Sequence, residues 1–287
     1  MKAMVTGGNG FIGSNLTDML VNQGYEVLVI DDLSSGKVEN QNKQARYMYM
    51  DVYKALKMLE EKGPFEADVI FHLAAMPRIQ PSFKDPVGTF DNNALRTMIV
   101  CEYAKKYNSR VVYAGSSTYY GGTSLNPYAF SKWVGEEICK FYGDLHGMNT
   151  SIARFFNVYG PRHLVEGPYS TVVGIFEKQY REGMDLTVTG NGEQRRDFTH
   201  VYDICSGLIK ISKCENKGTV YNLGTGTNYS INELAHMFED SRVQYIPKRP
   251  GEAKETRADI SFTTEKTGWQ PELKLEDYIK EFLNDIR

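Results

Sequence analysis

The segment Thr6-Gly7-Gly8-Asn9-Gly10-Phe11-Ile12-Gly13 decides the fold of this chain. It directly follows the β-rich run 3–6 and opens an amphipathic run, so we expect a strand, a turn and a helix. Glycines at this spacing permit a tight turn, close approach of the backbone to a pyrophosphate, and close packing of helix on sheet. The start of the helix offers free N–H groups and a positive dipole end to phosphates. The segment therefore predicts a dinucleotide site with contacts from Gly7, Gly10, Phe11, Ile12 and Gly13.

An acidic residue after the second expected strand indicates which dinucleotide binds. Asp31 ends the run 26–31 and lies about 20 residues beyond the turn, where a carboxylate accepts hydrogen bonds from the hydroxyls of an adenosine ribose. The same carboxylate repels a 2′-phosphate, and no arginine immediately follows it. We therefore expect NAD rather than NADP. The alternative is that Asp31 and Asp32 only begin a solvated loop.

The first 155 residues alternate short β-rich runs with longer amphipathic runs. This alternation is typical of parallel strands joined by helices that cover both faces of one sheet. We therefore expect an α/β fold with a doubly wound parallel (Rossmann) sheet. The expected strands are 3–6, 26–31, 47–50, 68–73, 111–114 and 150–154, and the expected helices are 12–22, 53–62, 87–107 and 128–147.

After about Pro161 the elements become shorter and are separated by glycine-rich and proline-rich turns. We expect a smaller C-terminal lobe packed on the first, with a substrate in the cleft between them. Residues 1–160 and about 198–225 are assigned to the NAD-binding domain, and about 161–197 and 226–287 to the second lobe. The expected elements are helices at 171–182 and 201–212, strands at 186–188 and 219–222, and short helices from Ile231 and Leu275.

Composition and charge limit the classes of partner. The chain has 287 residues, of which 41% are hydrophobic, and a net charge of only -3, which argues against nucleic acid and against an acidic membrane surface. No run approaches the roughly 18 apolar residues of a membrane helix. The start lacks the pattern of a signal peptide, so we expect a cytoplasmic protein. The four cysteines form no CxxC pair, and we expect neither a disulfide nor a metal site.

A second motif, Tyr128-Ala129-Phe130-Ser131-Lys132, carries candidate chemistry. Its spacing places Tyr128 and Lys132 one helical turn apart on one face. A free tyrosine, with a pKa of about 10, is a poor base at neutral pH. A neighbouring ammonium and a positively charged nicotinamide ring should lower the pKa of Tyr128. Alone, the motif also fits an ordinary amphipathic helix with an exposed lysine.

A serine upstream strengthens this interpretation. Ser116 follows the β-rich run 111–114. The carboxyl end of a strand in an open parallel sheet faces the ligand crevice. Ser116 is therefore placed to hydrogen-bond a substrate hydroxyl or the oxygen of Tyr128.

These motifs resemble those of the extended short-chain dehydrogenase/reductases, specifically the NAD-dependent sugar epimerase/dehydratase group. The resemblance runs nearly from end to end, through TGGNGFIG (6–13), VIFHLAA (69–75), SSTYYG (116–121), YAFSK (128–132), RFFNVYGPR (154–162) and RRDFTHVYD (195–203). It implies that Tyr128 is the acid/base, with Lys132 and Ser116 as its catalytic partners. The implied cofactor contacts are Asp51 and Val52 beside the adenine, and Ala74, Ala75, Asn93, Tyr128 and Lys132.

The resemblance also implies a nucleotide-sugar substrate, held largely by the second lobe. Arginine suits a pyrophosphate because its planar, permanently charged fork binds phosphate in bidentate fashion. Ordinary surface salt bridges remain the alternative for these arginines. The implied substrate-binding residues are Thr118, Asn157, Arg196, Arg249 and Glu252. His72 and His200 are expected to pack or to hydrogen-bond rather than to catalyse.

One position separates the members of the family. Dehydratases and decarboxylases typically carry a glutamate two residues after the catalytic serine or threonine, where this chain has Thr118. A hydroxyl does not form a carbanion at neutral pH, so we expect a reaction that needs only reversible hydride transfer. That reaction is epimerisation of a nucleotide sugar at C4, of the UDP-glucose/UDP-galactose type, through a 4-keto intermediate.

Several alternatives stay open. The connection 121–126 is shorter than family members usually show, and Phe155 and Thr256 fall where some epimerases carry tyrosines, so the sugar is not specified. The alternative enzymes are a nucleotide-sugar 4,6-dehydratase, a decarboxylase or another nucleotide-sugar epimerase. A non-catalytic dinucleotide-sensing protein is the alternative of another class. The resemblance also implies a homodimer formed through the helices expected at 87–107 and 128–147.

Overall fold

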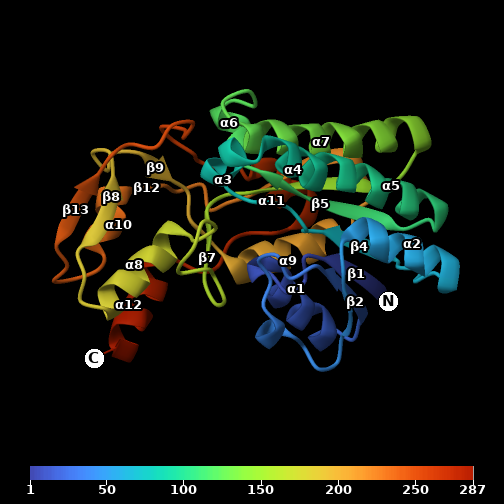
Figure 1. The fold of residues 1–287 in the computed structure, drawn as a ribbon, viewed down its shortest axis with the longest axis horizontal. Coiled ribbons are helices and arrows are strands. Elements are labelled where there is room, and N and C mark those ends of the chain that lie inside the picture. The colour runs from blue at the N-terminus through green and yellow to red at the C-terminus, as the bar shows by residue number, and fades with distance from the viewer. Residues whose placement is uncertain (287) are drawn as a thin grey trace.

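Seven parallel strands form the central sheet of the computed structural model, which describes residues 1–286 (Figure 1). Arg287, the last residue of the expected second lobe, lies outside the described residues. The strands are β1 (Lys2–Thr6), β2 (Glu26–Asp31), β3 (Arg46–Tyr49), β4 (Val69–His72), β5 (Arg110–Ser116), β6 (Thr150–Phe155) and β11 (Lys217–Leu223). Their order across the sheet is β11-β6-β5-β4-β1-β2-β3, with every neighbouring pair parallel. The expected doubly wound α/β fold is confirmed.

Helices cover both faces of this sheet. Side chains alternate along a strand, so Met4 of β1 belongs to one buried cluster, while Ala3 and Val5 belong to another. The first cluster is completed by α2 (Val52–Lys62), α5 (Arg96–Lys106) and α7 (Pro127–His146), and the second by α1 (Phe11–Asn22) and α9 (Val201–Ile211). These two cores fix the carboxyl ends of the strands relative to the start of each helix.

Whereas α11 (Ser261–Thr267) packs on β11, most of the remaining C-terminal elements lie beside the sheet, on the left in Figure 1. Aromatic and aliphatic side chains, with Phe176 and Phe238 at the centre, make a third core there. The elements beyond β6 that lie outside the large sheet are β7 (Val158–Tyr159), α8 (Val172–Arg181), β8 (Leu186–Thr189), β9 (Arg195–Arg196), β10 (Thr199–His200), β12 (Tyr229–Ser230), α10 (Ile231–His236), β13 (Val243–Ile246), α11 (Ser261–Thr267) and α12 (Leu275–Ile286).

The helix expected over 87–107 is present, but a π-helical turn interrupts its α-helical hydrogen bonding. The chain forms α3 (Ile79–Lys84), α4 (Pro86–Phe90), the π-helical turn η2 (Asp91–Leu95) and then α5. Pro86 begins α4, and the carboxylate of Asp85 caps it by accepting a hydrogen bond from the N–H of Gly88 at 2.9 Å. The π turn lies where Asn93 is buried against the sheet. Two short elements, η1 (Val38–Asn40) and α6 (Thr118–Gly121), complete the fold.

Two further properties concern the chain as a whole. No helix within residues 1–286 has both the length and the hydrophobicity needed to cross a bilayer. The four cysteines are free thiols, three of them buried and Cys214 half-buried.

The fully buried side chain of Trp269 fastens the segment after α11 to the sheet domain. Its indole Nε1 donates hydrogen bonds to the carbonyl of Asp203, at 3.0 Å, and to Oγ of Ser206, at 3.2 Å. The carboxylate of Asp203 in turn accepts hydrogen bonds from the N–H groups of Glu272 and Leu273. The start of α9 and the C-terminal segment are therefore joined by both packing and hydrogen bonds.

We predict that Trp269→Ala lowers the free energy of unfolding by about 3–5 kcal/mol, because it leaves a large cavity. Trp269→Phe should lower it by about 1–3 kcal/mol, because it mainly removes the two hydrogen bonds. Urea unfolding followed by circular dichroism measures both. The exposed Val38→Ala serves as the control and should change the free energy by less than about 0.5 kcal/mol. A Trp269→Ala value within the control's range contradicts this account.

Candidate active site

The turn between β1 and α1 requires glycine at two positions. Gly7 has φ +74°, and a Cβ there would lie 2.8 Å from the backbone nitrogen of Ala74. A Cβ on Gly13 would lie only 2.1 Å from the carbonyl oxygen of Gly7. Gly10 precedes α1, and among the described residues no side chain caps that helix. Its first-turn N–H groups are therefore available to an anionic ligand.

Asp31 lies beside this turn at the end of β2. Its carboxylate accepts hydrogen bonds from the N–H groups of Asn9, at 2.9 Å, and Leu33, at 2.8 Å. Burial raises the pKa of Asp31, and these two backbone hydrogen bonds oppose that shift. Oδ1 of Asn9 is buried and has no hydrogen-bond partner within residues 1–286. The two backbone hydrogen bonds thus hold the carboxylate of Asp31 in one orientation next to the glycine turn.

The structure places Asp51 and Val52 at the start of α2, on the same edge of the sheet. Asp31 pairs with Tyr49 across β2 and β3, and Asp51 follows two residues later. The carboxylate of Asp51 caps α2 and forms a salt bridge with Nε of Arg96 at 3.0 Å. Asp51 therefore stabilises the fold even without a bound ligand. Val52 packs into the core.

Asn93, in the π turn, holds the segment after β4 against α7. Its Oδ1 accepts a hydrogen bond from the N–H of Met76 at 2.8 Å. Its Nδ2 donates to the carbonyl of Met76, at 3.1 Å, and to Oγ of Ser131, at 3.0 Å. Ala74, two residues beyond the end of β4, donates its N–H to Oγ1 of Thr6 at 3.2 Å. The expected cofactor residues Ala74, Ala75 and Asn93 therefore lie between the glycine turn and the helix that carries Lys132.

Ser116, Thr118 and Tyr128 meet at the carboxyl end of β5. Oγ of Ser116 accepts hydrogen bonds from Oγ1 of Thr118, at 2.9 Å, and from the N–H of Thr118, at 3.2 Å. The hydroxyl of Tyr128 donates to the same oxygen at 3.5 Å. The N–H of Tyr128 donates to Oγ of Ser82 in α3 at 3.1 Å, which fixes the first turn of α7. The three expected residues are therefore brought into one hydrogen-bonded group.

Lys132 lies one turn beyond Tyr128 on α7 and is buried. Its Nζ is 4.3 Å from the centroid of the Tyr113 ring, and it forms no salt bridge with any described residue. Burial lowers the pKa of Lys132 to about 8, while the charge of Glu136 acts in the opposite direction. Lys132 is therefore a buried cation that forms no salt bridge with a carboxylate of residues 1–286.

The expectation that neighbouring groups lower the pKa of Tyr128 is wrong for the protein alone. Burial raises this pKa, and the hydrogen bond to Ser116 and the charge of Arg78 lower it by less. The physical reason is that removing a phenolate from water outweighs the nearby favourable groups. The expected lowering of this pKa by a positively charged nicotinamide ring stays a prediction.

Two expected substrate residues are held by contacts to residues of the second lobe. Nδ2 of Asn157 donates to the carbonyl of Asp197, at 3.0 Å, and to Oγ1 of Thr256, at 3.2 Å. Arg196 forms a salt bridge with Glu252 at 3.5 Å, and the same arginine donates a hydrogen bond to a neighbouring carbonyl. These contacts hold both side chains in place.

The segment containing Arg249 and Glu252 lies over α3 and the start of α7. Nε2 of Gln80 donates to the carbonyl of Pro250 at 2.9 Å, and Nδ2 of Asn126 donates to that of Gly251 at 3.1 Å. This segment therefore lies on the same side of the molecule as Tyr128. Arg249 is exposed, whereas Glu252 is half-buried.

Sequence reasoning missed Arg78. This residue has φ +83°, which is unusual for a residue other than glycine, and its Nε donates to the carbonyl of Tyr169 at 3.2 Å. Its charge interacts with Tyr128, Arg249 and Glu252. No local pattern in the sequence marks it, because its position depends on the fold of the segment between β4 and α3.

The two histidines act structurally. His72 lies between the hydroxyls of Thr6, at 2.7 Å, and Thr97, at 3.1 Å, and burial lowers its pKa to about 3. His200 accepts a hydrogen bond from the N–H of Tyr202 and so caps α9, and burial lowers its pKa to about 4. Within residues 1–286 no three potential metal-ligating side chains come together.

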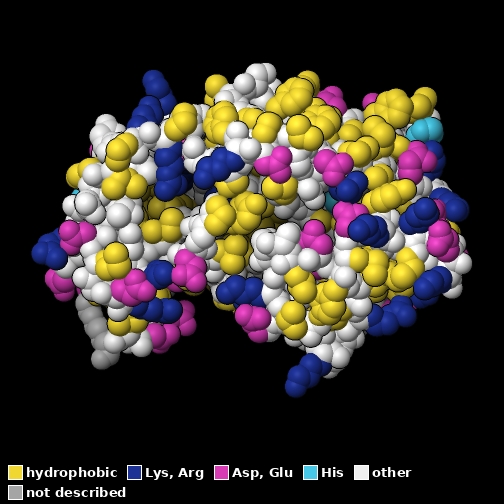
Figure 2. All heavy atoms as spheres, viewed as in Figure 1, with side chains coloured by type: hydrophobic (Ala, Val, Ile, Leu, Met, Phe, Trp, Pro, Cys, Tyr) yellow, Lys and Arg dark blue, Asp and Glu magenta, His cyan; other side chains and the backbone are white. Residues whose placement is uncertain are grey.

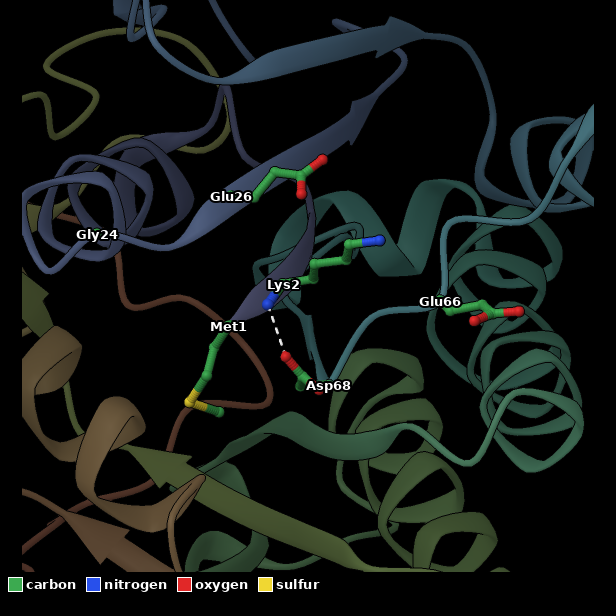
Figure 3. Close-up of a pocket in the computed structure, with 6 residues that line it drawn as sticks. All are labelled: Met1, Lys2, Gly24, Glu26, Glu66 and Asp68. Carbon is green, nitrogen blue, oxygen red and sulfur yellow. Dashed lines mark hydrogen bonds between the residues drawn. The ribbon is translucent and has the colours of Figure 1, made fainter.

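A surface pocket of about 500 Å³ lies at the opposite edge of the sheet (Figure 3). It surrounds the starts of β1 and β2, and the N–H of Lys2 donates to the carboxylate of Asp68 there at 2.7 Å. Ligands of open parallel sheets bind at the carboxyl ends of the strands. No expected site residue lines this pocket, so it is not the candidate active site.

Comparisons with known proteins identify the family of this chain. Residues 3–224 match the profile of the NAD dependent epimerase/dehydratase family. A putative UDP-glucose 4-epimerase of Methanocaldococcus jannaschii is 33% identical over 98% of this chain and 97% of its own length. UDP-glucuronic acid decarboxylase 1 of Arabidopsis thaliana is 29% identical over 100% of this chain and 70% of its own length. The crystal structure of UDP-glucose 4-epimerase with UDP-glucose from Thermotoga maritima has a TM-score of 0.92 at 28% identity and covers 99% of both chains. This chain belongs to the NAD dependent epimerase/dehydratase family.

Proposed function

We propose that this chain is an NAD-dependent epimerase that inverts C4 of a UDP-linked sugar. The observation that carries the proposal is the hydrogen-bonded group of Ser116, Thr118 and Tyr128 beside the buried Lys132. This group lies at the carboxyl edge of the sheet, on the same edge as the glycine turn. Epimerases among the similar proteins, described above, support the assignment.

The residues of this chain fit NAD. The uncapped start of α1 and the glycine turn suit a pyrophosphate, and the fixed carboxylate of Asp31 suits the adenosine ribose. We propose the other contacts at Phe11, Ile12, Asp51, Val52, Ala74, Ala75 and Asn93. When bound, NAD supplies the hydride acceptor and donor. Lys132, which has no carboxylate partner among the described residues, is free to donate hydrogen bonds to the cofactor and to favour the phenolate of Tyr128.

In the proposed reaction, Tyr128 removes the proton from the C4 hydroxyl and later returns it to the inverted product. Ser116 orients that hydroxyl and the phenol, because its oxygen lies between Tyr128 and Thr118. The sugar turns over within the pocket while Asn157, Arg196, Arg249 and Glu252 hold the nucleotide. We propose that the sheet domain, 1–160 with about 198–225, binds NAD, and that the second lobe binds the nucleotide.

Thr118 distinguishes this proposal from its nearest alternatives. Its hydroxyl donates a hydrogen bond to Oγ of Ser116. A hydroxyl is also too weak a base to form a carbanion at neutral pH. The decarboxylases among the similar proteins make decarboxylation of a UDP-uronate the second candidate. The products of the two reactions differ, so one experiment separates them.

We also propose a cytoplasmic homodimer. A hollow of about 920 Å³ lies between α4 and the start of α7, lined mostly by apolar side chains that include Phe83, Val87, Phe90, Leu95 and Phe130. Figure 2 shows hydrophobic side chains gathered over α4, α5 and α7, at the top of the view. A contiguous apolar surface of this kind is typical of an interface, and two long helices per subunit suit a four-helix contact. The four free thiols support a reducing compartment.

The first test is incubation of the NAD-loaded protein with UDP-glucose, UDP-galactose and their N-acetyl and uronate forms, followed by NMR of the products. We expect interconversion of one 4-epimeric pair. Tyr128→Phe should lower kcat by about 10²–10⁴-fold, because the proton acceptor is lost. The exposed Tyr245→Phe is the control and should keep full activity. A 4-keto-6-deoxy sugar or a pentose as product contradicts the proposal.

The cofactor preference depends on Asp31. We predict that Asp31→Asn weakens NAD binding by about 10- to 100-fold, since charged hydrogen bonds to the ribose are lost. It should weaken NADP binding less, because the repulsion of the 2′-phosphate is removed. Calorimetry of the protein without substrate measures both affinities. Asp32→Asn, at the exposed neighbouring carboxylate, is the matched control, and an equal loss in both variants would refute the role of Asp31.

The dimer proposal is tested by sedimentation. We predict that Phe130→Asp converts the dimer to a monomer, because a charge replaces an aromatic ring that stacks on Phe90 in the apolar hollow. Phe262→Asp, at an equally exposed ring outside this surface, should leave the dimer intact. Sedimentation of the unaltered protein as a monomer at micromolar concentration overturns the proposal.

A further inference from the structure

A buried ion pair lies directly behind Tyr128 and Lys132. Nη2 of Arg154, in β6, is 2.6 Å from Oε2 of Glu136, in α7, and Nε of Arg154 donates to both carboxylate oxygens at 3.1 Å. The two side chains are 6% and 1% exposed. Neither residue was a candidate from the sequence, and nothing in the mechanism proposed above uses them.

The carboxylate of this pair is close to the candidate catalytic face. Tyr128, Lys132 and Glu136 follow one another at intervals of four residues along α7, so they share one face of the helix. A carboxylate one turn beyond a lysine on a helix is within reach of that lysine. Here no salt bridge joins Glu136 to Lys132 within residues 1–286, and Arg154 binds both carboxylate oxygens instead.

The same guanidinium also holds the turn that carries Thr118. Its Nη1 donates to the hydroxyl of Tyr120 at 3.1 Å, and its Cζ lies 3.4 Å from the centroid of the Tyr119 ring. The hydroxyl of Tyr120 donates in turn to Oδ1 of Asn222 in β11 at 2.9 Å. Arg154 therefore links α7, α6 and the sheet at the back of the site.

The other titratable groups around Tyr128 and Lys132 do not take the place of Glu136. On β4 and β5, His72 is neutral, with a pKa of about 3, and burial raises the pKa of Tyr113 far above neutrality. On α7, Cys139 is a thiol with a raised pKa, hydrogen-bonded to Cys101 of α5. From the other side, Arg78 contributes a positive charge near Tyr128, and Glu252 faces Arg78. Glu136 is the carboxylate whose charge acts on both Lys132 and Tyr128.

We propose that Arg154 is a positioning residue of this site: it holds Glu136 away from Lys132, so that the lysine remains an unpaired cation beside Tyr128. The inference rests on the proposed role of Tyr128 and Lys132 as a working pair. An arginine suits this task better than a lysine, because its fork engages both carboxylate oxygens and still has a donor for Tyr120.

The test measures the titration of Lys132 directly, by NMR of protein carrying ¹³C-labelled lysine, with Lys132→Met assigning the signal. The midpoint in the unaltered protein should lie at about pH 8. Arg154→Met should raise it by about one pH unit, because the freed carboxylate pairs with the lysine. Glu136→Gln should lower it by a similar amount, because an unmatched guanidinium remains. The double variant should return to within about 0.3 unit of the unaltered value, since both charges are gone.

The pH dependence of kcat/KM for the epimerisation should shift in the same directions. Removing one partner of a buried pair destabilises a protein strongly, whereas replacing both is better tolerated. The double variant and Arg154→Lys therefore serve if a single variant does not fold. Arg242→Met, which removes an exposed ion pair with Asp185 far from the site, is the control and should leave the midpoint unchanged.

The outcomes separate this inference from the proposed function. Single variants that lose stability or activity while the Lys132 midpoint stays fixed would show a structural pair only and overturn the inference. Opposite shifts in the two single variants, cancelled in the double variant, support it. Such opposite shifts support the inference even if the substrate panel identifies a reaction other than 4-epimerisation. That result would overturn only the proposed function.

Discussion

The contact between Gly13 and the carbonyl of Gly7 is the constraint on which the site depends. A methyl group at Gly13 would lie 2.1 Å from that oxygen, so α1 packs this closely on β1 only without a side chain. The close packing brings the uncapped start of α1 beside Asp31. Because β4 and β5 run parallel to β1, their carboxyl ends bring Ala74 and Ser116 to the same edge. One steric restriction thus sets where a dinucleotide and a substrate meet.

Burial then decides the electrostatics at that edge. Tyr128 and Lys132 are both removed from water, which raises the pKa of the phenol and lowers that of the ammonium. The two shifts move these pKa values apart, because the phenol rises from an ordinary value of 10.0 and the ammonium falls from 10.5, and each shift depends on which neighbours carry charge. The charge of Arg78 acts on Tyr128, and the charge of Glu136, which is paired with Arg154, acts on both Tyr128 and Lys132. These residues are therefore part of the same electrostatic arrangement.

The sequence allowed prediction of what is encoded locally. The glycine turn, Asp31 and the one-turn spacing of Tyr128 and Lys132 are visible because each follows from neighbours in the chain. The pairing of Glu136 with Arg154 is not visible, because the two residues are 18 positions apart and meet only through the order of β5 and β6. The π turn at 91–95 is not visible either, because the pattern of a helical run does not reveal an asparagine that is buried against the sheet. The direction of the Tyr128 pKa shift is not visible, because it depends on how deeply the phenol is buried.

The last strand of the large sheet, β11, comes from residues 217–223, far along the chain from the other six strands, and this matters for fragments of the protein. β11 pairs with β6 along its length, from Lys217 opposite Thr150 to Leu223 opposite Phe155. β11 is itself the edge strand of the sheet, but without it the edge would be β6, whose residues are all buried except the half-buried Phe155. An exposed edge strand of this kind is a surface on which strands of separate molecules join. A fragment ending before Lys217 would therefore retain the glycine turn, Tyr128 and Lys132, yet be prone to aggregate. The last strand thus keeps the buried strand β6 away from the edge of the sheet.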